Sequence, residues 1–216
     1  TIDRTAIEHA QDLGLLHGVT TNPAILAQAS EPAEEILDAL LNYFSGPLAV
    51  QVTLRSSSEM VEQGKDLYEF SSRIIVKIPA TQEGLEAIFR LSHGEIPVMA
   101  TAIFEPLQAF LAIKAGARYV VPYFSHLGER ALPVCHAIQR MLIHQRAAKL
   151  LVASLATPSQ VSQCAESDFS AVTLKSDLFN QCLMTPPQTL DHLNRFEAAW
   201  KEAPPSNLLA LPQFIR

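Results

Sequence analysis

One lysine lies inside an apolar run that is typical of a buried strand. Residues 74–79 read Ile-Ile-Val-Lys-Ile-Pro, and Ala80 and Thr81 follow. Burial penalises an ammonium, so a buried and unpaired lysine loses its proton more readily and becomes a free amine near neutral pH. A free amine is the form that attacks a carbonyl to make a Schiff base. Lys77 is therefore the first candidate catalytic residue, and the alternative is a lysine on an edge strand or at a solvent-exposed rim.

Polar residues recur where other predicted strands end. In an α/β barrel the catalytic groups gather at the carboxyl ends of the strands. A single hydroxyl there usually has a partner in the core, but six consecutive strand ends with polar residues indicate a shared pocket. These residues are Thr20, Thr21, Asn22, Gln51, Thr53, Thr101, Tyr123, Ser154, and Thr173 or Lys175.

Seven short apolar segments would carry these residues. The predicted strands are 18–22, 48–53, 74–79, 98–103, 119–124, 150–155 and 171–175, and helical patterns lie between them. This alternation is typical of βα units on a parallel sheet, and the near-continuous apolar character fits strands buried on both faces. Ser56 with Glu59 forms a capping box, Pro106 opens another helix, and Gly116 closes it.

We expect an α/β fold, a (β/α)8 TIM barrel whose first strand is largely missing from the numbered chain. Residues 5–13 already have a helical pattern and almost nothing precedes them. The alternative is an open doubly wound sheet, which lacks support because no glycine-rich nucleotide motif is present. A single barrel domain should span 1–216, with a helix and tail from about 188 to 216 packing on the core or on a neighbouring subunit. The apolar stripe of this helix is Leu190, Leu193, Phe196 and Trp200.

Composition favours a small-molecule substrate. The 216 residues carry a net charge of −6, which makes a nucleic-acid or anionic-membrane surface improbable. Three cysteines without CxxC spacing indicate neither a disulfide framework nor a zinc site. The strand ends offer neither clustered histidines nor paired carboxylates, so we expect no metal and no cofactor. Because no long apolar run or signal peptide is evident, we expect a cytoplasmic protein.

Several motifs together resemble one known family. They are GVTTNP at 18–23, VKIPAT at 76–81 followed by EGL at 83–85, ATA at 100–102, AGA at 115–117 and VAS at 152–154. Over nearly the whole chain this pattern is similar to the small transaldolase and fructose-6-phosphate aldolase family. The resemblance implies a metal-free class I aldolase on a (β/α)8 barrel. It also implies a homo-oligomer, a pentamer or decamer, in which the C-terminal helix reaches a neighbour.

The resemblance also implies roles for single residues. Lys77 matches the Schiff-base lysine, and Tyr123 matches a tyrosine that acts as acid and base. Thr101 matches a hydroxyl near the catalytic water. Positions that hold substrate hydroxyls or the intermediate are matched by Thr20, Asn22 and Ser154.

Two positions distinguish the branches of this family. Transaldolases of the family carry Glu at the position of Gln51 and usually Phe at that of Tyr123, whereas the aldolases resemble this chain at both. An amide, unlike a carboxylate, has no proton to exchange at neutral pH. We therefore expect reversible aldol cleavage and addition between a dihydroxyacetone-like donor and an aldehyde such as glyceraldehyde 3-phosphate. The alternatives are a transaldolase and, from another class, a non-catalytic sugar-phosphate-binding barrel.

The chain departs from the family where phosphate is bound. His126 stands where the family usually has Arg, and Ala156 stands where the family usually has Lys or Arg. Arg130 remains as a candidate anion ligand with a planar guanidinium. Since an imidazole holds phosphate well only when protonated, His126 favours a neutral or weakly charged substrate.

Two further charged residues differ from the family pattern. Its first-strand Asp would fall just before Thr1, and Asp3 fits a helix cap better than a catalytic role. Lys175 has no counterpart in the family. We expect it either to point outward into a salt bridge or to lie in the mouth of the pocket, where its charge would replace the lost phosphate ligands.

Overall fold

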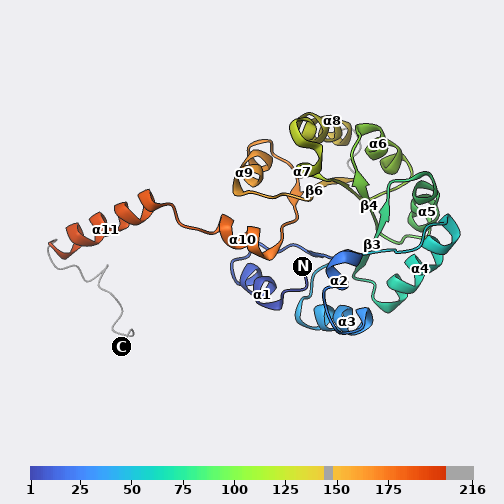
Figure 1. Cartoon of the computed structure of the whole chain (residues 1–216), viewed down its shortest axis with the longest axis horizontal. Coiled ribbons are helices and arrows are strands. Elements are labelled where there is room, and N and C mark those ends of the chain that lie inside the picture. Colours follow the sequence, from blue (N-terminus) through green and yellow to red (C-terminus); the bar gives the residue numbers. More distant parts are fainter. Residues whose placement is uncertain (144–147, 203–216) are drawn as a thin grey trace. The chain divides into compact units, whose positions relative to one another are not determined.

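A curled parallel sheet surrounded by helices forms the first and larger part of the chain. The computed structural model describes residues 1–143 and 148–202, and Figure 1 labels their helices and strands. The strands pair in chain order: β1 (Val19–Thr20), β2 (Leu48–Gln51), β3 (Ile74–Pro79), β4 (Val98–Ile103), β5 (Tyr119–Pro122), β6 (Lys149–Val152) and β7 (Ala171–Val172). Seven parallel strands with outer helices fit a (β/α)8 barrel with one strand missing, which confirms the predicted fold class.

The described helices alternate with the strands. They are α1 (Arg4–Asp12), α2 (Pro23–Leu26), α3 (Ala33–Tyr43), α4 (Ser57–Phe70), α5 (Gln82–His93), α6 (Pro106–Lys114), α7 (Phe124–Leu127), the 3₁₀ turn η1 (Gly128–Arg130), α8 (Ala131–Ile143), α9 (Pro158–Glu166), α10 (Ser176–Cys182) and α11 (Pro187–Lys201). Within the described ranges, none of these helices has the length and apolar character needed to cross a membrane.

The chain separates into two compact units, Thr1–Cys182 and Leu183–Arg216. The first unit holds the sheet. The described part of the second unit is α11, on which Leu190, Leu193, Phe196 and Trp200 are all exposed. The predicted tail after Pro204 lies outside the described residues.

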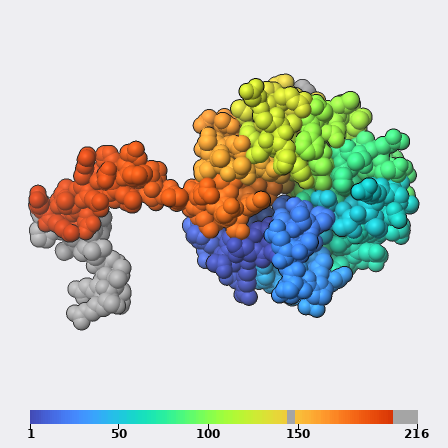
Figure 2. All heavy atoms as spheres, in the orientation of Figure 1, coloured from blue at the N-terminus to red at the C-terminus, as the bar shows by residue number. Residues whose placement is uncertain are grey.

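The first and last parts of the barrel unit are neighbours. In Figure 2 the blue atoms of the N-terminal region lie beside the orange atoms of the last elements of this unit. The Oγ1 atoms of Thr20, at the end of β1, and Thr173, just after β7, are 2.8 Å apart. Thr1 Oγ1 is 3.2 Å from Ser176 Oγ at the start of α10. These contacts bring the two edges of the sheet together.

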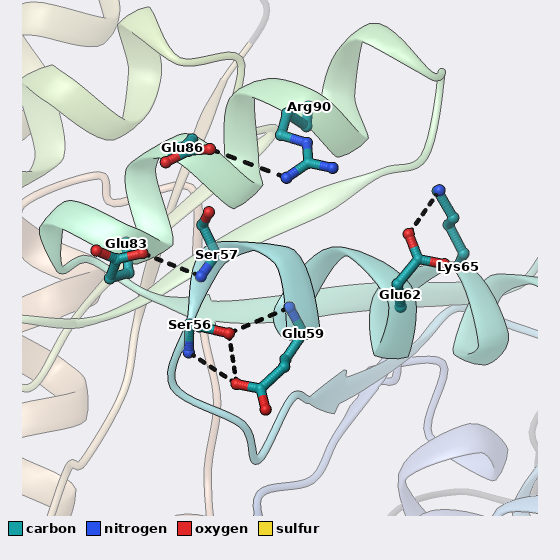
Figure 3. Close-up of polar contacts among 8 residues, drawn as sticks. All are labelled: Ser56, Ser57, Glu59, Glu62, Lys65, Glu83, Glu86 and Arg90. Carbon is teal, nitrogen blue, oxygen red and sulfur yellow. Dashed lines mark hydrogen bonds and ion pairs between the residues drawn. The ribbon is translucent and has the colours of Figure 1, made fainter.

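Helices α4 and α5 pack side by side over β3, and their first turns are tied together (Figure 3). Ser56 and Glu59 cap α4 with the predicted capping box. Glu83, in the first turn of α5, accepts a hydrogen bond from the backbone N–H of Ser57 at 3.0 Å. Thr81 caps α5 by accepting from Gly84 N–H, so only Ala80 and Thr81 separate β3 from α5.

The strands bury two different apolar layers. Facing the lumen are Ala49, Ile75, Met99, Val121, Leu151 and Ala153, packed with the half-buried Tyr119 and Tyr123. The alternate residues of the strands, such as Val76 and Ala100, pack in the layer that contacts the helices. Since side chains alternate along a strand, Gln51 and Lys77 belong to the lumen face, at its carboxyl end.

Strand β4 contains a bulge that changes this alternation. Its register with β5 slips by one residue between Ala100 and Ile103, and Ala102 has a φ of 56°. Thr101 lies on the lumen face, as ordinary alternation from Met99 requires, but beyond the bulge Ile103 packs in the outer layer.

Several of the predicted strands were too long. The strand predicted at 119–124 ends at Pro122 because α7 begins at Phe124, and the one at 150–155 ends at Val152, just before Ser154 with its φ of 59°. The segments 18–22, 48–53 and 171–175 also shorten, to β1, β2 and β7. Proline at 23 opens α2, which explains the early end of β1.

Candidate active site

Lys77 is buried on a central strand. It lies on β3 between β2 and β4, and only 6% of it is exposed, so the edge-strand or rim alternative was wrong. Its Nζ donates a hydrogen bond to the Thr21 carbonyl at 2.6 Å. Burial lowers the pKa of the Lys77 amine from 10.5 to about 8. A substantial fraction of this amine is therefore neutral near physiological pH, as a nucleophile requires.

Gln51 lies beside Lys77 on the neighbouring strand. The two residues are direct partners in the β2–β3 register, so both side chains project from the same face. Gln51 Oε1 is buried, and nothing in the described parts of the chain donates a hydrogen bond to it. A buried oxygen without a partner costs free energy, so a ligand that donates to it would gain affinity.

Thr101 and Tyr123 form a hydroxyl pair near the same end of the barrel. Thr101 is fully buried on β4, two positions beyond Met99, the register partner of Lys77, and its Oγ1 is 3.1 Å from Tyr123 Oη. Tyr123 follows β5 and forms a bridge with Ala153 after β6. The threonine thus fixes the orientation of the phenol hydroxyl, as a proton donor or acceptor requires.

Ser154 and His126 meet beside Tyr123. Ser154 Oγ is 2.9 Å from His126 Nδ1, and the His126 ring centroid is 5.9 Å from that of Tyr123. Phe104, after β4, packs edge-on against both rings, at 5.6 Å from Tyr123 and 6.4 Å from His126. Sequence reasoning missed Phe104, because a single apolar residue after a strand carries no signal of its own.

Thr20 and Asn22 lie at the end of β1 and already have partners. Thr20 shares a hydrogen bond with Thr173, a residue that the sequence placed at the last strand end. Asn22 Oδ1 caps α2 by accepting from Ile25 N–H at 2.9 Å. This bond fixes the Asn22 side chain by its oxygen and leaves its amide hydrogens for another acceptor.

The remaining charged candidates are not drawn into this group of contacts. Arg130 Nη1 makes an ion pair with Glu105 Oε1 at 2.8 Å, and both side chains are more than half exposed. Lys175 is exposed, and the ion pairs found in 1–143 and 148–202 do not include it. Asp3 accepts from Ala6 N–H as the N-cap of α1, which confirms its predicted role as a cap.

The described residues at this site do not form a metal cluster. Among the described residues, no three His, Cys, Asp or Glu side chains are grouped to hold a metal ion. A cavity of about 320 Å³ lies at the opposite end of the strands, where Pro47, Arg73, Pro97 and Arg118 precede β2 to β5. In barrels of this kind that end serves stability rather than chemistry.

Comparison with known protein families gives a match over most of the chain. The family model described as Transaldolase/Fructose-6-phosphate aldolase matches residues 1–207. A probable transaldolase of Coprothermobacter proteolyticus is 35% identical over 202 residues, covering 92% of this chain and 93% of the relative. A probable transaldolase of Thermoplasma volcanium is 34% identical over 212 residues, 95% of each chain.

Solved structures share the fold at low sequence identity. A structure titled native KDPGal has a TM-score of 0.57 and 17% identity, and covers 92% of this chain and 88% of its own. A mandelate oxidase mutant with an FMN adduct has a TM-score of 0.55 and 18% identity, over 80% of this chain and 58% of the other. At such identities the likeness concerns the fold alone.

Proposed function

Because this chain belongs to the transaldolase/fructose-6-phosphate aldolase family, we propose that it is a Schiff-base aldolase of the fructose-6-phosphate aldolase type. It would reversibly join a dihydroxyacetone-like ketone donor and an aldehyde. The observation that carries this proposal is Lys77, a buried amine at the carboxyl end of a central strand whose pKa is lowered to about 8. Its Nζ has a carbonyl oxygen, not a carboxylate, as its hydrogen-bond partner, so no ion pair holds the amine in its charged form.

The proposed reaction follows from the positions of these groups. The neutral Nζ of Lys77 adds to the ketone carbonyl, and loss of water gives an iminium. In cleavage, the electron pair of the breaking C–C bond moves toward the iminium nitrogen and gives an enamine, while the leaving aldehyde forms from its alkoxide as a base takes the hydroxyl proton. Tyr123, oriented by Thr101 at 3.1 Å, is the group we assign to that proton transfer.

Gln51 and Tyr123 favour aldol chemistry over transaldolase chemistry. Gln51 offers an amide beside Lys77, and its buried Oε1 accepts from a donor such as a water or substrate hydroxyl. We assign Thr20, Asn22 and Ser154 to the substrate hydroxyls. The second candidate is a transaldolase, which is what the names of both relatives suggest.

Trapping of the iminium tests the class of enzyme. The protein is incubated with dihydroxyacetone or fructose 6-phosphate and cyanoborohydride, and intact-mass spectrometry with peptide mapping locates any adduct. We expect one adduct per chain, on Lys77, and none in Lys77→Met. An unmodified Lys77 with both donors would refute the Schiff-base proposal and favour the non-catalytic sugar-phosphate-binding barrel.

A comparison of two activities separates the branches. The first is release of free dihydroxyacetone and glyceraldehyde 3-phosphate from fructose 6-phosphate, and the second is transfer of the donor to erythrose 4-phosphate. Tyr123→Phe should weaken cleavage more than transfer, because transaldolases of this family usually carry Phe at the position of Tyr123. Equal losses in both assays would remove Tyr123 as the basis for choosing the aldolase branch.

Assembly and location complete the proposal. Family likeness supports a homo-oligomer, a pentamer or decamer, with the C-terminal helix reaching a neighbouring subunit, and a cytoplasmic enzyme acting on small sugars. Light scattering on the purified full chain measures the subunit number. A monomer at micromolar concentration would refute the proposed assembly.

A further inference from the structure

Three rings form one side of the site, beyond Lys77. We call Phe104, Tyr123 and His126 the aromatic wall; their centroids are 5.6, 5.9 and 6.4 Å apart. The rings come from the segments that follow β4 and β5. Ser154 Oγ lies 2.9 Å from His126 Nδ1, so this nitrogen already has a partner. The wall therefore presents ring edges and faces, with no permanent positive charge.

Two backbone donors after β6, near the wall, are also occupied. After β6, the N–H of Ala156 donates to Gln160 Oε1 at 2.8 Å, and Ser125 Oγ donates to the same oxygen at 2.9 Å. Thr157 Oγ1 accepts from Gln160 N–H at the start of α9. Free N–H groups at a strand end or helix start are what a barrel usually offers to a phosphate. Here a side-chain oxygen and a hydroxyl have taken two of them.

One arginine at this end of the barrel is paired with a carboxylate. Arg130, at the end of the 3₁₀ turn η1, is paired with Glu105 at the start of α6. An exposed pair of this kind adds little stability, but the carboxylate cancels the charge that a phosphate would need. Two further cations lie at this end of the barrel, Arg55 between β2 and α4 and Lys175 after β7, and neither has a described hydrogen bond to the aromatic wall.

From these contacts we infer that the aldehyde substrate of this enzyme is uncharged rather than phosphorylated. This inference rests on the proposed aldolase function. The aldehyde carbon reacts at the Lys77-bound donor, and the remainder of the aldehyde lies against the aromatic wall, where apolar groups and single hydroxyls are accommodated without an anion ligand.

A matched pair of aldehydes tests this inference. With dihydroxyacetone as the donor, kcat/KM is measured for D-glyceraldehyde and for D-glyceraldehyde 3-phosphate. We expect the uncharged aldehyde to be used at least as efficiently as its phosphate ester. A tenfold or larger preference for the phosphate ester would overturn the inference. If that preference disappeared in Lys175→Met, Lys175 would be identified as the phosphate ligand.

Variants at position 126 isolate the effect of charge. His126→Arg places a permanent cation beside Ser154, and should raise kcat/KM for the phosphate ester about tenfold, as expected for one new charge-assisted hydrogen bond. His126→Gln removes the ring without adding charge and should give no such gain. Equal kcat/KM values of the two variants for the phosphate ester would show that the lack of a cation does not determine the choice of aldehyde. That result would contradict the inference.

Iminium trapping separates this inference from the proposed function. Trapping of dihydroxyacetone on Lys77 needs no aldehyde, so its absence would refute the proposed function together with everything built on it. Trapping combined with a preference for the phosphate ester would refute the uncharged aldehyde alone. Trapping without turnover of D-glyceraldehyde would likewise count against it.

Discussion

The buried ammonium of Lys77 should destabilise the folded protein in a pH-dependent way, and Lys77→Met should reveal this cost. Burial lowers the pKa of this lysine from 10.5 to about 8. Between these two pH values the unfolded chain binds a proton that the folded protein has released. The stability of the wild type therefore rises with pH from about 8 to 10.5, and the full cost of the charge is present below pH 8.

The structure gives the size of this effect. Each factor of ten between the two dissociation constants is worth about 1.4 kcal/mol, so the lowered pKa corresponds to about 3 kcal/mol at pH 7. Methionine has a similar length and no charge, so the variant avoids this cost. The variant also loses the 2.6 Å hydrogen bond to the Thr21 carbonyl, at about 1–3 kcal/mol. That second loss does not change with pH, so the pH dependence isolates the burial of the charge.

Urea unfolding at pH 7, 8, 9 and 10 measures the difference in unfolding free energy between Lys77→Met and the wild type. Far-UV circular dichroism is the appropriate signal, because the single tryptophan, Trp200, lies on α11 outside the barrel unit. The unfolding free energy of Lys77→Met minus that of the wild type should fall by about 2 kcal/mol or more between pH 7 and pH 10. Lys175→Met removes a charge from an exposed position and serves as the control. A difference that stays constant over this pH range would refute the reasoning.

Three further outcomes are expected. Trapping at Lys77 should increase with pH to half its plateau near pH 8, where half of the amine is neutral; a midpoint near 10 in a pH series of intact masses would contradict this. Gly84→Ala should destabilise the barrel by about 2 kcal/mol or more in urea unfolding, because its Cβ would lie 1.9 Å from the Pro79 carbonyl oxygen. Gly94→Ala, with its closest contact at 3.4 Å, is the matched control, and an equal cost would exclude this cause. Ser56→Ala should cost about 1 kcal/mol by removing the α4 cap, and an unchanged urea midpoint would show that the cap is not needed.

The strands and the position of Lys77 could be predicted from sequence because their signals are local. Apolar β-branched runs of four to six residues identified β2, β3 and β4, and the capping box at Ser56 and Glu59 located the start of α4. Because all strands of such a barrel are parallel, one residue near the carboxyl end of each strand was enough to group the polar candidates at one end.

The contacts between loops could not be predicted in the same way. The Arg130–Glu105 pair and the Ser125–Gln160 hydrogen bond join residues 25 and 35 positions apart, on different βα units. Nothing in the local sequence of Arg130 distinguishes a side chain free to bind an anion from one held by a carboxylate. The short helix α7 was missed because four residues carry too little periodicity to separate a helical turn from the end of a strand.

The bulge at Ala102 makes the lining of this site depend on the number of residues in β4 as well as on their identity. With the extra residue, Thr101 contacts Tyr123, Ile103 packs in the outer layer, and Phe104 reaches the aromatic wall. Deleting Ala102 would reverse the alternation of side chains after this position, so Ile103 would point to the lumen and Phe104 would point to the helices. Single-residue deletions here should therefore be far more damaging than substitutions. A library that varies the length of this segment, rather than its composition, would show how the pocket wall tolerates evolutionary change.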